Sequence, residues 1–353
     1  MREITAHIGR MPLLLATPTL ADGHLDPEVL VGRLERLEAA GTEPGPYDLA
    51  QALLRLPRDA AGADSAVTAR AERLTSPAGG TVAAVLRAGG IADPVVERAE
   101  FRFDEQSPAF QRPVVLHGLV RPAGDVPERP APLWEYPGDE ESRRKKPGYF
   151  FLLTPSTPPV WWPSITPSHA ELAAAHLLPE LVQRMAYPDG QGETLLGLAE
   201  CDGPTGGATG AALAYGLALD PARERTAAVD AFLHLAARGR LPAAAVGTAL
   251  GTLAAYRELR LGRVTAALGD AAAAGADAEV WTVVESALPA VLATDTGKPV
   301  TGTADLLALG VRTAEACRAR GPAPEGLAET AGRRGSSRTV TEAARLHALL
   351  TRA

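Results

Sequence analysis

The stretch DPARERTAAVDAFLHLAARG, residues 220–239, carries the pattern that decides the fold. A polar residue and a proline come first, and apolar residues then recur at the spacing of one helix face: Val229, Phe232, Leu233 and Ala236. The same punctuation opens further apolar segments toward the C-terminus, at Leu241-Pro242, Asp277, 301–303 and Ser336-Ser337. Short amphipathic helices with brief connections are typical of stacked helix pairs, and a pair here occupies roughly 40 residues, near the HEAT and armadillo period.

The first hundred residues repeat this pattern. Asp26-Pro27 is a helix N-cap followed by proline at the first helical position. Further apolar-periodic segments predict a helix from about Pro46, one over 67–74 and one between Pro77 and Gly89. The sequence therefore predicts a mainly α protein, a HEAT/armadillo-like α-solenoid of stacked helix pairs.

The middle of the chain interrupts the helices with a small irregular β or loop insertion. Proline becomes dense, Ala99, Phe101 and Phe103 alternate with charged residues, and 114–116 and 149–153 are short apolar runs. Residues 122–147 are too polar to build a core. Helix resumes at 168–171, where Ser-His-Ala-Glu matches a capping box. Three regions are therefore predicted: helices over 1–98, the proline-rich segment over 99–167, and helical repeats over 168–353.

Composition narrows the class of protein. Hydrophobic residues make up 46% and aromatic residues 5%, so the core must be built from Ala, Leu and Val. The net charge of −7 gives no global attraction to nucleic acid or to an anionic membrane. Cys201 and Cys317 are interpreted as buried or free thiols, and Cys317 is placed on an apolar helix stripe. No apolar stretch is long enough to span a membrane. These features predict a cytoplasmic protein.

No catalytic, metal or cofactor site is predicted. The glycine run 203–210 lacks the lysine of a phosphate-binding loop, which favours an interhelical turn. Asp295-Thr296-Gly297 occurs once, whereas an aspartic protease needs two facing carboxylates, so a helix-ending turn is favoured. The sequence contains no His-Glu-x-x-His, no Cys-x-x-Cys and no Gly-x-Ser-x-Gly.

Two readings of the middle segment remain open. Its bulky aromatics either pin a loop onto the helices or contact a partner protein. The candidate contact residues lie there and at the start of the next helix: Tyr149, Phe150, Trp161, Trp162, His169 and His176. The histidines are seven positions apart on one helix, about 10 Å, which is too far to share a metal ion. An enzyme pocket is the alternative, and it would be lined by Trp161, Trp162, His169, Glu171 and His176.

Several phrases resemble one known group of proteins: LLATPT (14–19), DLAQALLRL (48–56), AAHLLP (174–179) and AVDAFLHLAARG (228–239). They resemble the C-terminal part of large HEAT-like helical proteins, a domain of unknown function in high-GC actinobacteria. The resemblance implies no catalytic residues. It implies further helical sequence ahead of 14–19, so that Met1 would begin a truncated or split form. It also implies a partner, either a SWIM-type zinc-finger protein or an upstream helical chain.

The expected function is a non-enzymatic scaffold or adaptor that binds another protein. An enzyme or enzyme subunit, with its pocket between the middle segment and the helices, is the second hypothesis. A nucleic-acid-associated helical-repeat protein is the third, and only small basic spots such as 143–146 favour it.

Overall fold

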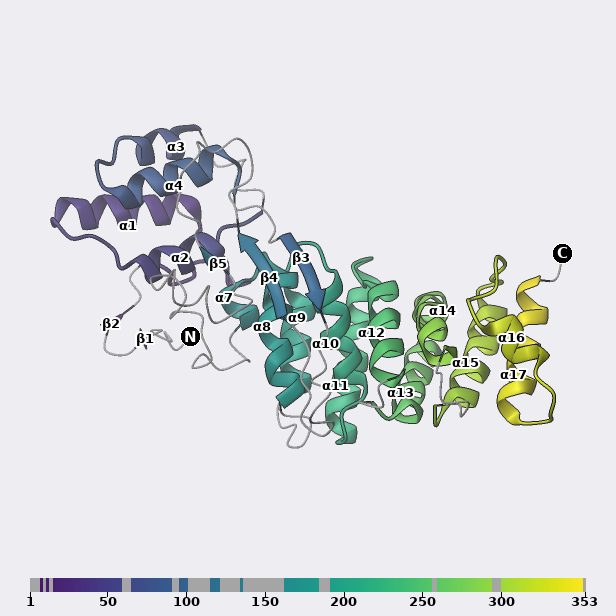
Figure 1. The fold of residues 1–353 in the computed structure, drawn as a ribbon. Helices are drawn as coiled ribbons and strands as arrows, with labels where there is room; N and C mark the ends of the chain where they lie inside the picture. The colour runs from purple at the N-terminus through teal and green to yellow at the C-terminus, as the bar shows by residue number, and fades with distance from the viewer. Residues whose placement is uncertain are drawn as a thin grey trace. The chain divides into compact units, whose positions relative to one another are not determined.

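The protein is mainly helical, as expected from the sequence (Figure 1). The computed structural model describes residues 7–8, 11–12, 15–58, 65–90, 95–100, 115–120, 134–135, 162–183, 191–255, 259–293 and 300–351. The chain divides into two compact units. Unit 1 comprises Met1–His176 and Glu200–Pro204, and unit 2 comprises Leu177–Ala199 and Thr205–Ala353. The three regions drawn from the sequence stay a prediction.

Unit 1 contains helices and short strands. Its helices are α1 (Pro27–Ala39), α2 (Pro46–Leu54), α3 (Ser65–Glu72), α4 (Pro77–Arg87), α7 (Trp162–Ile165) and the first half of α8 (Ala170–Gln183). Its strands are β1 (His7–Ile8), β2 (Met11–Pro12), β3 (Val95–Glu100), β4 (Val115–Val120) and β5 (Trp134–Glu135). Strands β3, β4 and β5 form one antiparallel sheet in that order, with an irregular register between Val96 and Arg98.

Local sequence explains the predicted helix starts in unit 1. The Asp26 carboxylate accepts a hydrogen bond from the Glu28 N–H at 2.8 Å, and Pro27 occupies the first helical position of α1. Ser76 caps α4 in the same way, with Pro77 next. Helices α1, α3 and α4 contact one another around a core that includes Leu30, Val82 and Leu86.

Unit 2 consists of helices among its described residues. After the second half of α8 come α9 (Gln191–Glu200, of which Glu200 belongs to unit 1), α10 (Gly207–Leu217), α11 (Ala222–Ala237), α12 (Ala243–Ala255), α13 (Leu261–Ala273), α14 (Asp277–Leu292), α15 (Thr303–Ala316), α16 (Leu327–Gly332) and α17 (Arg338–Thr351). The predicted starts after Asp220-Pro221 and Leu241-Pro242, and at Asp277, are confirmed within two residues. Helices α13 and α16 were not predicted.

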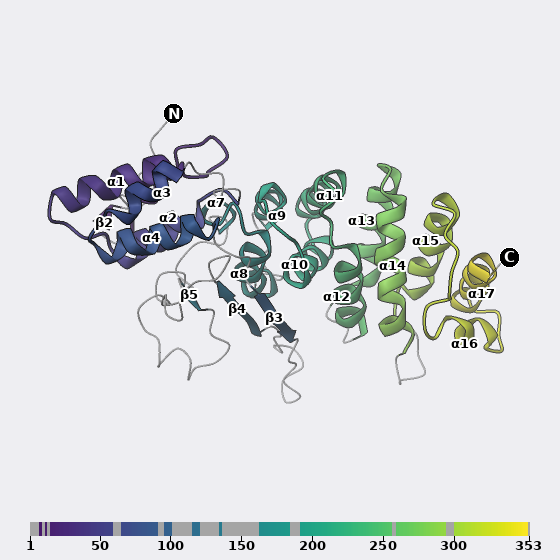
Figure 2. The same ribbon diagram turned by 90° about the horizontal axis from the view of Figure 1, so that it is seen from above.

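The helices of unit 2 pack mainly against their second neighbours. Helix α10 contacts α12, α12 contacts α14, and α14 contacts α16. A second series runs from α11 to α13, α15 and α17 (Figure 2). Contacts α10–α11, α13–α14, α14–α15 and α16–α17 join the two series. Most of these helices therefore bury one stripe along their own series and another against the other series, whereas α12 packs mainly against α10 and α14.

Glycines let α12 approach its neighbours at backbone distance. A Cβ atom at Gly247 would lie 2.2 Å from the Val283 carbonyl oxygen of α14, and one at Gly251 would lie 2.6 Å from the Ala287 carbonyl oxygen. On the other side of α12, a Cβ atom at Gly210 of α10 would lie 2.7 Å from the Ala245 carbonyl carbon. These separations are far below van der Waals contact, so any larger residue forces the helices apart.

Two predictions need correction, one about a turn and one about the position of Cys317. The glycine run 203–210 is only partly a turn, because Gly207 to Gly210 form the first turn of α10. Cys317 does not lie on the buried stripe of α15. It is the half-buried C-cap residue of that helix, where the chain leaves the packed face. Residues 101–114, 121–133 and 136–161, with Phe101, Phe103, Tyr149, Phe150 and Trp161, lie outside the described residues, as do 294–299.

We predict that Gly247→Ala destabilises the protein by about 1–3 kcal/mol, because the added methyl group overlaps the Val283 carbonyl. Gly262→Ala in α13 is the matched control. It is exposed, and nothing lies within 4 Å of its Cβ position, so alanine there stabilises the helix by about 0.5–1 kcal/mol. Urea unfolding followed by circular dichroism measures both changes. Equal effects at the two positions would contradict the close-approach interpretation.

Candidate functional site

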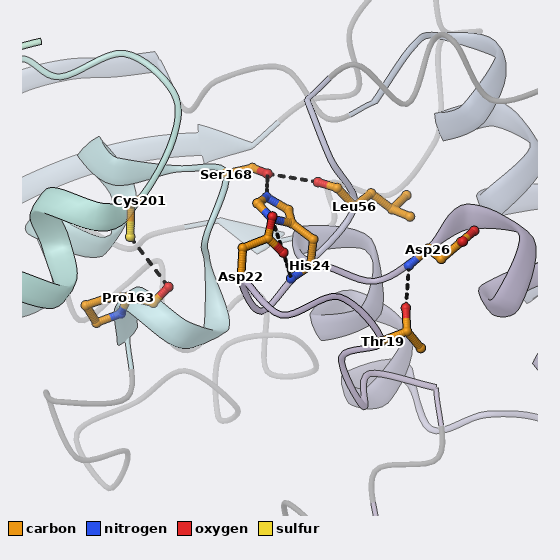
Figure 3. A network of polar contacts seen from close by, with 8 residues as sticks. All are labelled: Thr19, Asp22, His24, Asp26, Leu56, Pro163, Ser168 and Cys201. Atoms are coloured by element: carbon orange, nitrogen blue, oxygen red, sulfur yellow. Dashed lines mark hydrogen bonds and ion pairs between the residues drawn. The ribbon is translucent and has the colours of Figure 1, made fainter. Parts of the chain in front are cut away.

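The most concentrated group of buried polar side chains in the described part of unit 1 surrounds Ser168. Ser168 is 1% exposed and precedes α8. Its hydroxyl group lies 2.7 Å from His24 Nε2 and 2.9 Å from the Leu56 carbonyl oxygen (Figure 3). His24 in turn lies 3.1 Å from Asp22 through its Nδ1 atom. We call Asp22, His24, Ser168 and the Leu56 carbonyl the Ser168 junction.

A tight loop holds His24 in this position. The backbone N–H groups of Thr19 and Leu20 both donate to the His24 carbonyl oxygen at 3.0 Å. Gly23 has a φ of +91°, a conformation that side chains other than glycine rarely adopt. The Thr19 hydroxyl accepts a hydrogen bond from the Asp26 N–H at 2.8 Å, which ties the loop to the start of α1 (Figure 3).

The start of α8 is held by a second segment of unit 1. The Asp202 N–H donates to the Pro167 carbonyl at 2.6 Å, and the Ala170 N–H donates to the Asp202 carbonyl at 3.0 Å. The buried Cys201 thiol donates to the Pro163 carbonyl oxygen at 3.5 Å (Figure 3). The capping box at 168–171 stays a prediction, and the described hydrogen bonds of the Ser168 hydroxyl group go to Leu56 and His24.

Asp22, His24 and Ser168 contact one another in the order of a hydrolase triad, but the Ser168 hydroxyl group has a second partner, the Leu56 carbonyl oxygen. The Leu56 carbonyl can only accept, so the Ser168 hydroxyl hydrogen points toward it. In that arrangement the Ser168 oxygen is left to accept from His24 Nε2, in a ring state that has a hydrogen on Nε2. A general base needs the opposite, a bare nitrogen facing the hydroxyl group. Ser168 is also buried, so the geometry argues for a structural junction and against a nucleophile.

Asp22 is the exposed end of the junction, with a side chain 64% exposed. The His24 backbone N–H donates to the Asp22 carboxylate at 3.1 Å. This bond, with a smaller contribution from the His24 ring, lowers the pKa of Asp22 below its ordinary value. The ionised carboxylate therefore stabilises the loop.

A buried arginine adjoins the junction. Arg55, the C-cap residue of α2, is 7% exposed, and its carbonyl oxygen accepts from the Leu25 N–H at 2.8 Å. Burial lowers the pKa of Arg55 to about 10. The exposed Arg58 donates from Nη1 to the Ser168 carbonyl oxygen at 3.3 Å. Sequence reasoning missed these arginines together with Asp22, His24 and Ser168.

Of the six predicted contact residues, the structure describes only the side chain of His169. It is 3% exposed and directly follows Ser168. Trp162 begins α7 and His176 lies within α8, but their side chains are outside the described part, as are Tyr149, Phe150 and Trp161. The proposed partner surface therefore stays a prediction, and the buried His169 side chain is not available to a partner. Glu171 is likewise buried.

The described residues hold no group of three or more His, Cys, Asp or Glu side chains arranged to bind a metal ion. In the described part of the chain no helix has the length and apolar character needed to cross a membrane. No protein-family model matches the chain, and neither the curated proteins nor the solved structures contain a significant match. The inference about function therefore depends on the sequence and the structure.

We predict that Ser168→Ala lowers the free energy of unfolding by about 1–3 kcal/mol, because it leaves the buried Leu56 carbonyl without its partner. His24→Ala and the double variant complete a thermodynamic cycle. A coupling of about 0.5–3 kcal/mol is expected, because the two side chains share one hydrogen bond. Strictly additive effects would show that the junction is not a single network.

The same geometry predicts that a fluorophosphonate probe does not label Ser168 in the folded protein. The hydroxyl group is buried and donates its hydrogen to the Leu56 carbonyl. Mass spectrometry of the probe-treated protein measures labelling, with urea-unfolded protein and a known serine hydrolase as controls. Stoichiometric labelling of Ser168 would restore the enzyme hypothesis.

The lowered pKa of Asp22 predicts a pH dependence of stability. A depressed carboxyl pKa stabilises the fold above the ordinary value of 3.8, and this contribution is lost as the pH falls through the folded-state pKa. Asp22→Asn should therefore be less stable than the parent protein at pH 7, by less than about 1 kcal/mol because the group is exposed. The difference should shrink on acidification. A constant difference from pH 7 to pH 3 would contradict the assignment.

Proposed function

We propose that this protein is a non-enzymatic helical-repeat scaffold that binds another protein. The observation that carries the proposal is the second-neighbour packing of α10 to α17, in which each helix contacts the next member of its own series. That order is typical of α-solenoids of the HEAT and armadillo type, whose stacked helices present long surfaces to extended partners. We accordingly propose the solenoid as the architecture of unit 2.

The charge of α12 and α14 favours a protein partner over nucleic acid. Helix α12 carries no charged residue, and its exposed positions are Ala244 and Thr248. The charged residues of α14 are all acidic: Asp277, Glu279 and Glu285. Burial raises the pKa of Glu285, which marks a partly desolvated carboxylate that would repel a phosphate backbone. Nucleic-acid binding requires the reverse, lysine and arginine facing the phosphates.

The proposal includes a cytoplasmic location and one partner protein. Cys201 and Cys317 are both free thiols, as expected of a chain in a reducing compartment. On the resemblance of its sequence phrases, the partner is a SWIM-type zinc-finger protein or a separately encoded helical chain. An enzyme pocket is the weaker alternative, because Ser168 is engaged in the junction and Glu171 is buried.

Affinity capture from the native host tests the scaffold proposal. We expect the tagged full chain to retain one protein reproducibly and stoichiometrically, with a complex that survives nuclease treatment. A capture that disappears with nuclease would instead support the nucleic-acid hypothesis. Capture of no protein across growth conditions would overturn the scaffold proposal.

Charge-insertion variants then locate the contact. Thr248→Arg places a long cation on the exposed face of α12, and Ala266→Arg places the same side chain on the exposed face of α13. We expect Thr248→Arg to weaken capture by at least about 10-fold, because an unpaired charge is forced into the interface, and Ala266→Arg to leave capture unchanged. Circular dichroism checks that both variants are folded. Equal capture by the two variants would rule out the α12 series as the contact surface.

A further inference from the structure

Arg55 stands apart from the other arginines described in unit 1. Its side chain is 7% exposed, and its Nε atom has no hydrogen-bond partner among the described residues. By contrast, Arg33 donates to the Leu15 and Thr17 carbonyl oxygens at 2.7 Å, and Arg70 forms an ion pair with Glu35 at 2.7 Å. Among the described residues, Arg55 forms no ion pair at all.

A buried guanidinium without a counter-charge is expensive. Even with a pKa lowered to about 10 by burial, Arg55 stays protonated at physiological pH. Removing a charged group from water costs several kcal/mol unless opposite charge and hydrogen bonds replace the lost hydration. A protein that retains such a group requires an explanation, and an anionic ligand is a direct one.

Hydrogen bonds connect the backbone around Arg55 to the Ser168 junction. Its carbonyl oxygen is bonded to Leu25, which directly follows His24, and the next residue, Leu56, is bonded to Ser168. Arg58 is anchored to the Ser168 carbonyl oxygen at 3.3 Å. The α8 helix of 14 residues begins two residues after Ser168, and the amino end of a helix carries partial positive charge. The Arg55 segment, Arg58 and the start of α8 are therefore all bonded to the Ser168 junction.

We propose that Arg55 is the anchor of a binding site for a small oxyanion, a phosphate or carboxylate group, at the end of α2 beside the Ser168 junction. The planar guanidinium offers parallel N–H donors that match two oxygens of either group. The bound anion supplies the counter-charge that the described residues do not. This site is independent of the scaffold proposal and uses no residue of α10 to α17.

Anion-dependent stability of the full chain tests the site. Thermal unfolding is measured in chloride, inorganic phosphate and succinate at one ionic strength and pH. We expect a saturable rise in Tm with phosphate or succinate but not with chloride, and the comparison of the two shows which oxyanion the site prefers. Arg55→Met should abolish the saturable rise, whereas Arg36→Met, at an exposed position of α1, should retain it.

A second variant and a direct measurement keep the proposal falsifiable. Calorimetric titration with the preferred anion should show at least about 10-fold weaker binding for Arg55→Lys, because a single ammonium cannot reproduce the guanidinium fork. This comparison holds even when Arg55→Met fails to fold. Equal Tm in the three salts, or an anion response that Arg55→Met or Arg55→Lys leaves unchanged, would overturn the proposal.

Discussion

The close approach of α12 to α14 is the constraint on which unit 2 depends. With only 5% aromatic residues, the chain cannot fill wide spaces between helices with large rings. It brings backbones together instead, and Gly247 and Gly251 make room for the carbonyl groups of Val283 and Ala287. Gly210 likewise allows the backbones of α10 and α12 to lie close together. Because α12 lies between these two neighbours, one oversized side chain on it would disturb the contacts to both.

Unit 1 is held together by a different means. Polar groups fasten segments that are far apart in sequence: Asp48 accepts from the N–H groups of Leu15 and Ala16, and Ser168 donates to Leu56 across 112 positions. Glu38 of α1 accepts from the Thr75 and Ser76 N–H groups ahead of α4. Such bonds contribute modestly when made and cost more when a buried partner is left alone. Unit 1 therefore combines its apolar core with matched hydrogen-bond donors and acceptors, whereas unit 2 depends on the close packing of its helices.

The two units also differ in what they suggest about function. The residues of unit 1 that resemble a catalytic triad hold a loop against the start of α8, and the Ser168 hydroxyl group is buried and also bonded to the Leu56 carbonyl oxygen. Arg55 is the exception, a buried charge that no described group neutralises. In unit 2, the second-neighbour packing of the helices and the uncharged α12 support the proposed contact with a protein.

Sequence alone determined where most helices begin. The starts at Asp26-Pro27 and Ser76-Pro77 were readable because caps and prolines act through residues next to them. The start at Asp277 was readable because an acidic residue in the first turn favours a helix. Helix α13 was not readable, since the preceding Arg260 makes no side-chain cap, nor was the six-residue α16. Tertiary structure alone decided which groups the Ser168 hydroxyl group bonds. Its sequence matches a helix cap, but a carbonyl 112 positions away and the His24 ring 144 positions away take up its hydroxyl group. A local sequence pattern cannot reveal a hydrogen-bond partner that only folding brings near. For the same reason, the sequence could not show that the buried Arg55 side chain has no partner for its Nε atom among the described residues.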